Sequence, residues 1–343
     1  MKKFNKYFSI HFSISIHLIF SSFLLGSEPN KSLDDKPYNE VTFVTAHNAY
    51  ASIAEGWMPL WGANQRESLS DQMKGGVNAL MLDIWPYQPK GGELDIYLWH
   101  NDPNSAIAYF FGLANLKMRT LQSGLMDVVN HLKKNPQAMM TIIFESHVSK
   151  GGASADEALR RSLEESKALQ YAFHPHQLSH ESVKGQVEWN VKTQGWPTLR
   201  WFKEHDLRLV MFTSERSNLR SEGGKTPQGL AYMWDYAIEN VWGSPGLDPS
   251  FYTDPRRESR QSIEELPLTC AYPLVIMNHF PTIPLNFEED PENESLESIR
   301  THMIKMIKRY GKRPNFIATN YTLGRRGPID RSLVRFVERM NRS

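Results

Sequence analysis

Residues 41–50 read VTFVTAHNAY, a short apolar segment that ends in the polar pair His47 and Asn48. Its β-branched and aromatic residues favour a β-strand over Val41–Ala46. Similar short apolar runs recur at six further places, namely Ala79–Ile84, Asp95–Trp99, Met139–Phe144, Arg208–Phe212, Leu274–Met277 and Asn315–Thr319. These runs make seven visible strands, and an eighth is expected around Tyr236–Val241.

Helical patterns separate these runs. Apolar residues recur at one-turn spacing from Leu121 to Leu132 before Pro136, and again from Leu296 to Ile307 before Gly311. Repeated alternation of strands and helices predicts an α/β fold with a parallel sheet buried on both faces. We expect a (β/α)8 TIM-type barrel, distorted or incomplete. A doubly wound open sheet is the alternative, although no Gly-rich phosphate loop follows the first strand.

The amino terminus differs in kind from the rest of the chain. Lysines precede an apolar run from Phe8 to Leu25, and small residues follow it, which is typical of a secretory signal peptide over residues 1–27. An uncleaved membrane anchor is the alternative. We therefore expect an exported protein, secreted or held in the periplasm or cell envelope. Residues 28–40 form a polar segment, and one barrel domain is expected over residues 41–343.

Composition excludes several classes of function. The formal net charge of +1 gives no global field that would attract nucleic acid. Cys270 is the only cysteine, so an intramolecular disulfide and a cysteine-based structural zinc site are both excluded. No feature identifies a protein partner.

Polar side chains follow four of the predicted strands. His47 and Asn48 end the first, Asp83 lies near the end of the second, His100 follows the third, and Glu145 follows the fourth. Because the carboxyl ends of parallel strands meet at one face of a barrel, we expect these side chains to converge. A lone histidine at a strand end is more often structural, but two at the same end favour an acid/base pair, which suits phosphodiester cleavage. The three oxygen donors suit Ca²⁺, or Mg²⁺, better than zinc.

Several of these segments resemble the X-region core of the phosphatidylinositol-specific phospholipase C family, within the phospholipase C-like phosphodiesterase superfamily. They are TAHNAY at 45–50, Asn64-Gln65, LMLD at 80–83 and LWH at 98–100. The chain is most similar to the short, signal-bearing members, and the resemblance covers most of residues 41–325.

The resemblance implies a distorted barrel and a phospholipid substrate at a membrane interface, cleaved when the inositol 2-hydroxyl attacks the phosphorus. His47 and His100 match the two family histidines. Asn48, Asp83 and Glu145 match metal ligands of the calcium-dependent members.

Two positions depart from the family pattern. Calcium-dependent signalling enzymes carry a Glu where this chain has Met81, and metal-independent bacterial members carry an Arg where it has Trp85. A calcium-type site is favoured because Asn48 and Glu145 are both present. Met81 also argues against the runner-up function, a glycerophosphodiesterase or sphingomyelinase D-like enzyme, because those enzymes place Glu-x-Asp on the second strand.

Two further alternatives concern binding. A catalytically weak lipid- or sugar-binding relative would not need both histidines. Trp57 and Trp61 lie in the loop 54–62, where they either insert into lipid headgroups or pack as a lid over the barrel mouth. Basic residues in later loops are candidates for contacting a phosphate, namely Arg216, Arg220, Arg325 and Arg326.

Overall fold

The computed structural model describes residues 32–58, 62–100, 102–103, 105, 118–219, 230–240, 273–280 and 295–343. The expected signal peptide, Trp61, Arg220 and Cys270 lie outside these residues. Within the part of the chain that the structure describes, no helix has the length and apolar character needed to cross a bilayer.

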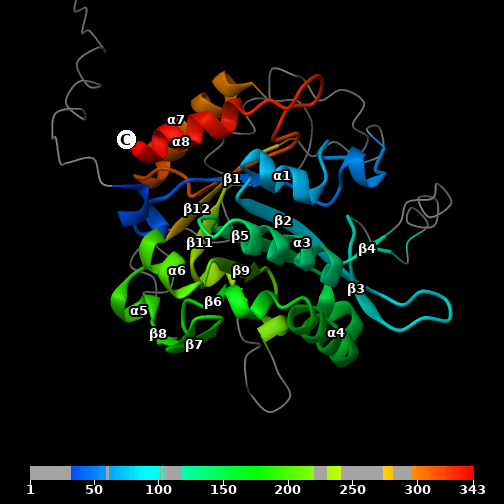
Figure 1. Ribbon diagram of the computed structural model, residues 1–343. Coiled ribbons are helices and arrows are strands. Elements are labelled where there is room, and N and C mark those ends of the chain that lie inside the picture. Colours follow the sequence, from blue (N-terminus) through cyan, green and yellow to red (C-terminus); the bar gives the residue numbers. More distant parts are fainter. Residues whose placement is uncertain are drawn as a thin grey trace, which may run out of the picture.

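In the described part of the chain, eight parallel strands form the centre of the fold and curl into a half-barrel (Figure 1). Each neighbouring pair along this path runs parallel. The α/β class and the expectation of an incomplete barrel are therefore confirmed. In sheet order the strands are β10 (Leu230–Tyr232), β9 (Leu209–Thr213), β5 (Met140–Ser146), β2 (Ala79–Tyr87), β1 (Phe43–Ala46), β13 (Phe316–Thr319), β12 (Leu274–His279) and β11 (Ala237–Glu239).

One predicted barrel strand is not part of the parallel path. β3 (Asp95–Leu98) pairs antiparallel with β2, with Tyr87 opposite Asp95 and Ile84 opposite Leu98, and it also pairs with β4 (Arg119–Thr120). The prediction was wrong here because β2 continues past Ile84 and turns back as a hairpin. β10, only three residues long, was missed.

Helices cover the outside of the curled sheet (Figure 1). α3 begins at the predicted Leu121, and α7 ends at Gly311, whose φ of 70° gives the expected left-handed cap. The helices are α1 (Leu69–Gly75), α3 (Leu121–Lys134), α4 (Gly152–Glu165), α5 (Val191–Gln194), α6 (Leu199–His205), α7 (Leu296–Tyr310) and α8 (Ser332–Arg342). Shorter elements include the strands β6 (Ala172–Phe173), β7 (Ser179–Ser182) and β8 (Gly185–Glu188).

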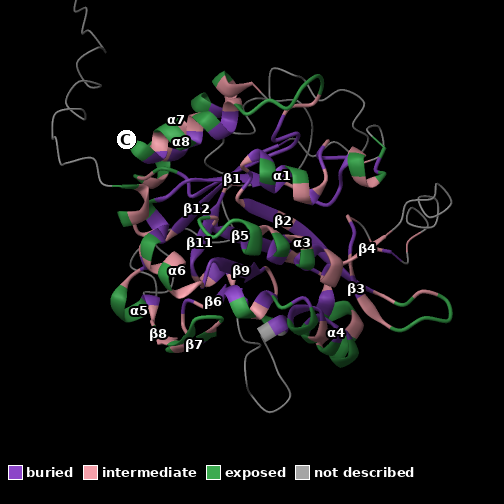
Figure 2. Cartoon of the chain, viewed as in Figure 1, coloured by how far each residue is buried: buried purple, intermediate pink, exposed green. Residues whose placement is uncertain are grey.

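The central strands are buried along most of their length (Figure 2). Their side chains alternate between two buried clusters. Leu80 and Leu82 of β2 pack in the cluster that includes the outer helices, whereas Ala79 and Met81 pack in the other. The second cluster lies on the concave face, because a small cavity on that side is lined by residues of β2, β5, β11 and β12 together. Asp83 shares the face of Met81 by alternation and therefore points into the barrel.

The short segment before β1 closes the amino end of the barrel. It holds η2 (Leu33–Asp35) and η3 (Tyr38–Glu40). Tyr38 is fully buried, stacks on Trp196 with ring centroids 4.9 Å apart, and shares a 2.7 Å hydrogen bond with Thr141.

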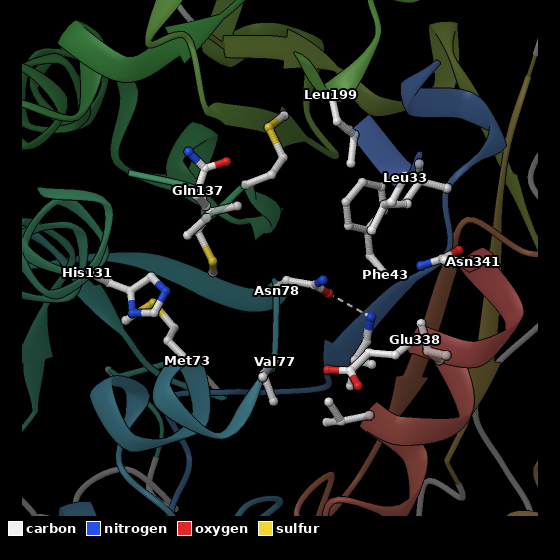
Figure 3. Close-up of a pocket in the computed structure, with 18 of the residues that line it drawn as sticks. Leu33, Phe43, Met73, Val77, Asn78, His131, Gln137, Leu199, Glu338 and Asn341 are labelled. Atoms are coloured by element: carbon white, nitrogen blue, oxygen red, sulfur yellow. Dashed lines mark hydrogen bonds between the residues drawn. The ribbon is translucent and has the colours of Figure 1, made fainter. Parts of the chain in front are cut away.

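A cavity of about 350 Å³ lies at this amino end of the strands (Figure 3). Strand starts and helix ends line it, among them Phe43, Val77 and His131. Asn78 Oδ1 accepts a 2.7 Å hydrogen bond from the backbone N–H of Val44 across it. None of the predicted site residues lines this cavity. Since active sites of such barrels form at the opposite end, we assign this face to stability.

Candidate active site

The floor of the candidate site is a ladder of side-chain pairs on β2 and β5. Asp83 and Glu145 are direct neighbours in the parallel register. Asp83 is buried and Glu145 is partly buried. One layer nearer the mouth, Trp85 stacks on His147 with ring centroids 3.9 Å apart. The two carboxylates therefore lie side by side just inside the barrel mouth.

A tight turn after β1 directs His47 and Asn48 toward this floor. The backbone N–H of His47 still donates to Thr319 of β13 at 3.0 Å, and Gln65 donates to the carbonyl oxygens of both residues. Asn48 then adopts a left-handed conformation with φ of 44°, which asparagine tolerates better than most residues. The chain thus leaves the barrel wall immediately after placing the two side chains.

His47 is held so that its Nε2 atom carries a lone pair. Its Nδ1 lies 2.8 Å from Asn320 Oδ1, and that oxygen also accepts a 3.3 Å bond from Asn64 Nδ2. Because the Asn320 oxygen can only accept, the neutral imidazole of His47 carries its proton on Nδ1. Burial lowers the pKa of His47 to about 4, and the Asn320 bond and the charge of Asp83 oppose this only in part. At neutral pH, His47 is therefore an uncharged base.

His100 has the opposite electrostatic environment. Its Nδ1 lies 3.2 Å from Asp83 Oδ2. Burial lowers the pKa of His100, but the hydrogen bond and charge of Asp83 together with the charge of Glu145 outweigh this, so the pKa lies above its ordinary value. When two titratable groups have pKa values pushed apart, the lower suits a base and the higher an acid.

The hairpin of β2 and β3 brings His100 to Asp83. The backbone N–H of Trp99 donates to the Asp83 carbonyl at 3.3 Å, which ties the end of β3 to β2. The sequence pattern predicts His100 at the carboxyl end of a parallel strand. His100 lies beside Asp83 as expected, but β3, which places it there, runs antiparallel to β2.

Asn48 connects the two histidines through a chain of amides. Its Nδ2 donates to Asn64 Oδ1 at 3.2 Å and lies 2.8 Å from Nδ1 of His100. The contact with His100 is a donation when Nδ1 is unprotonated, whereas Asp83 accepts from Nδ1 when it is protonated. The bond to Asn64 engages the Asn48 nitrogen whether or not His100 is protonated, which leaves the Asn48 carbonyl oxygen as the atom suited to coordinate a cation.

The predicted metal ligands are a partial fit to a hard cation. Asn48, Asp83 and Glu145 offer only oxygen atoms, as Ca²⁺ prefers. Among the residues that the structure describes, no three His, Cys, Asp or Glu side chains group closely enough to hold a metal. The buried Tyr50 hydroxyl lies near the two carboxylates, and burial, with their charges, raises its pKa well above the ordinary value. A bound cation would thus depend on Asn48 and on water as well as on the two carboxylates.

Three residues of the site were missed by sequence reasoning as functional side chains: Asn64, Asn320 and Phe280. Asn320 follows β13 just as His47 follows β1, so the same strand-end signal was present. Phe280 follows β12 and stacks on His47 with ring centroids 3.5 Å apart and planes 6° apart. An apolar residue at a strand end carries no such signal.

Aromatic and basic residues complete the mouth. Trp57 is 7% exposed and packs against Tyr50 and Trp99 with ring centroids 5.8 and 4.9 Å away, which favours the lid alternative for this residue.

Two basic side chains near the mouth contact other side chains. Arg216, one of the candidates for contacting a phosphate, forms an ion pair with Asp235. The ammonium group of Lys150 lies 3.9 Å above the ring of Trp85.

Comparison with known proteins agrees with this geometry. The family PI-PLC X 1 matches residues 33–324. The chain belongs to the PI-PLC X family. A PI-PLC X domain-containing protein of Arabidopsis thaliana is 26% identical over 303 residues, which cover 86% of this chain and 61% of the relative. The chain thus spans about three fifths of that curated protein.

Solved PI-PLC structures share the fold. The phosphatidylinositol-specific phospholipase C of Listeria monocytogenes superposes with a TM-score of 0.53 at 11% identity, covering 89% of this chain and 94% of that one. The Staphylococcus aureus enzyme gives 0.50 at 13% identity, with 89% and 94% covered. The curled half-barrel is therefore the distorted TIM barrel of the PI-PLC fold.

Proposed function

We propose that this PI-PLC X protein is a phosphoric diester hydrolase that cleaves a phospholipid on the diacylglycerol side of its phosphate. The observation that carries the proposal is the pair of imidazoles with oppositely shifted pKa values, connected through Asn48, Asn64 and Asn320 at the carboxyl ends of the strands. Membership of the family supports the reaction class.

The two histidines divide the proton transfers. Nε2 of His47 takes the proton of a headgroup hydroxyl next to the phosphate, and that oxygen forms a bond to phosphorus. The bond from phosphorus to the glycerol oxygen breaks, and protonated His100 donates its proton to the leaving alkoxide. The products are diacylglycerol and a cyclic phosphate, with His47 now protonated and His100 neutral. Reversing the two roles lets His100 activate water, which opens the cyclic phosphate and resets both groups.

The substrate carries its own nucleophile, which removes much of the entropic barrier of bringing two reactants together. Positioned acid/base groups contribute about a hundredfold or more in rate. Asp83 stabilises the protonated form of His100, and Asn320 holds the tautomer of His47.

We also propose that Ca²⁺ binds at Asn48, Asp83 and Glu145, where it would neutralise charge that develops on the phosphate oxygens. Mg²⁺ is the second candidate. Without the metal, Asp83 and Glu145 would still support the charged form of His100.

A membrane interface is the proposed place of action. Membrane binding is a property of the S. aureus enzyme, whose fold this chain shares. Export across a membrane, proposed from the basic and apolar residues 1–27, would deliver the protein to lipid outside the cytoplasm.

The test is incubation of the purified protein with vesicles of phosphatidylinositol, phosphatidylcholine, phosphatidylethanolamine or phosphatidylserine. Phosphorus NMR identifies the released headgroup, and lipid extraction identifies the neutral product. We expect diacylglycerol from phosphatidylinositol and a cyclic phosphate that later opens. Parallel samples with a chelator test the cation, since retained turnover would remove Ca²⁺ from the mechanism and leave the histidines.

Two outcomes would contradict the proposal. Release of a headgroup without its phosphate would indicate a phospholipase D-type bond cleavage. Binding to vesicles by the folded protein with no product from any lipid would favour a binding relative instead.

A further inference from the structure

Three neighbouring strands place His47, Asn320 and Phe280 at one level of the barrel mouth. Ala46 of β1 and His279 of β12 both pair with Thr319 of β13. One residue further along each strand, the register brings the base, the amide and the phenyl ring side by side. The ring of His47 is therefore held at Nδ1 by Asn320 and covered on one face by Phe280.

We propose that Phe280 is a positioning residue for the base, and that together with Asn320 it forms an uncharged clamp that fixes the ring of His47 and excludes water from one face. The role of this clamp in catalysis rests on the proposed function, but the clamp itself can be tested without any substrate.

Burial supports this role. Phe280 is 1% exposed, and Asn320 is 3% exposed, so neither side chain of the clamp is bathed by solvent. The ring planes of His47 and Phe280 lie nearly parallel, so the phenyl group covers an imidazole face rather than an edge. An imidazole held on one face and at one edge keeps its remaining edge, with Nε2, directed at the mouth.

The clamp contributes no charge of its own. A carboxylate at the Nδ1 side of a histidine stabilises the imidazolium, whereas the Asn320 amide accepts the same hydrogen bond while neutral. Phe280 acts in two opposing ways, since its face attracts a cation while its bulk removes the water that would solvate one. Desolvation is the largest influence on His47, and the net result is a pKa lowered to about 4.

On β12, the adjacent His279 turns away from the base, and its Nδ1 lies 2.9 Å from Nδ1 of His302 on α7. Phe280, the next residue along the chain, is the one that stacks on His47.

The experiment compares the ring of His47 by NMR at one neutral pH in wild type, Phe280→Leu and Asn320→Leu, which each remove one side of the clamp. Phe316→Leu is the control, because Phe316 is also a buried ring but stacks on Phe43 deeper in the barrel. In F316L, the ring of His47 should give the same nitrogen chemical shifts as in wild type.

The nitrogen chemical shifts of the same ring report its tautomer. We expect the Nδ1–H form in wild type and a mixture of tautomers in F280L. For activity at neutral pH, kcat should fall by about tenfold or more in F280L with KM little changed, because a misplaced base affects proton transfer rather than substrate binding. Should F280L fail to fold, Phe280→Met keeps the volume of the side chain and removes the flat face.

An unchanged tautomer of His47 in folded F280L or F280M would overturn the clamp. If no lipid is cleaved, the nitrogen chemical shifts still decide this question, and the proposed function fails separately. If these shifts are unchanged while lipid is cleaved, the clamp fails and the proposed function stands.

Discussion

Replacing Asp83 by Asn removes the charge that keeps His100 protonated. The carboxylate oxygen lies 3.2 Å from Nδ1 of His100, and an amide in its place has nearly the same shape but no charge. Burial, which lowers the pKa of His100, would then act with less opposition. The general acid should lose its proton at lower pH than in wild type.

The size of the effect follows from the geometry. Two unit charges 3.2 Å apart interact by about 1.3 kcal/mol in bulk water and about 5 kcal/mol at an effective dielectric constant of 20. The side chain of His100 is 38% exposed, so solvent screening places the interaction in the lower half of this range. An interaction of about 1.5–3 kcal/mol corresponds to about one to two units of pKa.

The assay is the pH profile of kcat/KM. Because His100 must be protonated to act, D83N should move the basic limb down by about one to two pH units, with a loss of about 10- to 100-fold at pH values above that limb. Activity should recover on acidification. Asp95→Asn is the control, since this carboxylate lies at the start of β3 and contacts Arg161 instead.

A uniform loss at every pH would refute the reasoning about His100. If added Ca²⁺ then restored activity, the role of Asp83 would be that of a metal ligand.

Two further predictions concern stability. A Cβ atom at Gly75 would lie 2.2 Å from Cδ1 of buried Leu323. Gly75→Ala should therefore lower the free energy of unfolding, measured by urea denaturation, by about 1–3 kcal/mol. Gly92→Ala is the control and should be close to neutral, because the nearest atom to a Cβ at Gly92 is 3.5 Å away. Equal effects of the two substitutions would contradict this packing. Burial and the neighbouring His279 hold the pKa of His302 well below its ordinary value. Below about pH 6.5, His302 therefore binds a proton in the unfolded chain but not in the folded chain. Stability should therefore fall on acidification by up to about 1.4 kcal/mol per pH unit from this group, and His302→Gln should flatten the slope measured between about pH 6.5 and 5.

Strand positions could be predicted from the sequence because buried parallel strands are short apolar runs. β1, β2, β5, β9, β12 and β13 each overlap a predicted segment, and β11 lies where the eighth was expected. β10 and β11 have three residues each, too few for a periodic pattern, and β10 was missed because its apolar residues run directly into those of the turn Met233–Asp235. The direction of β3 could not be read either, since an apolar run does not say which way its strand is paired.

Only those site residues that lie at or near strand ends could be predicted from the sequence. His47 and Asn48 directly follow β1, and Asp83 lies in the second half of the neighbouring strand β2, so their proximity followed from topology. The amide chain through Asn64 and Asn320 depends on side-chain orientation, which no spacing in the sequence encodes. Likewise, the stacking of Phe280 on His47 requires the register of β12 and β13 to be known.

The most direct test of the acid/base pair is turnover of phosphatidylinositol by His47→Ala, His100→Ala and the double variant. Groups that act together on one reaction give losses that do not multiply. We expect each single variant to lose at least about a hundredfold in kcat, and the double variant to be little worse than either. Independent losses that multiply in the double variant, or full turnover in either single variant, would contradict the pairing of His47 with His100 on one phosphate.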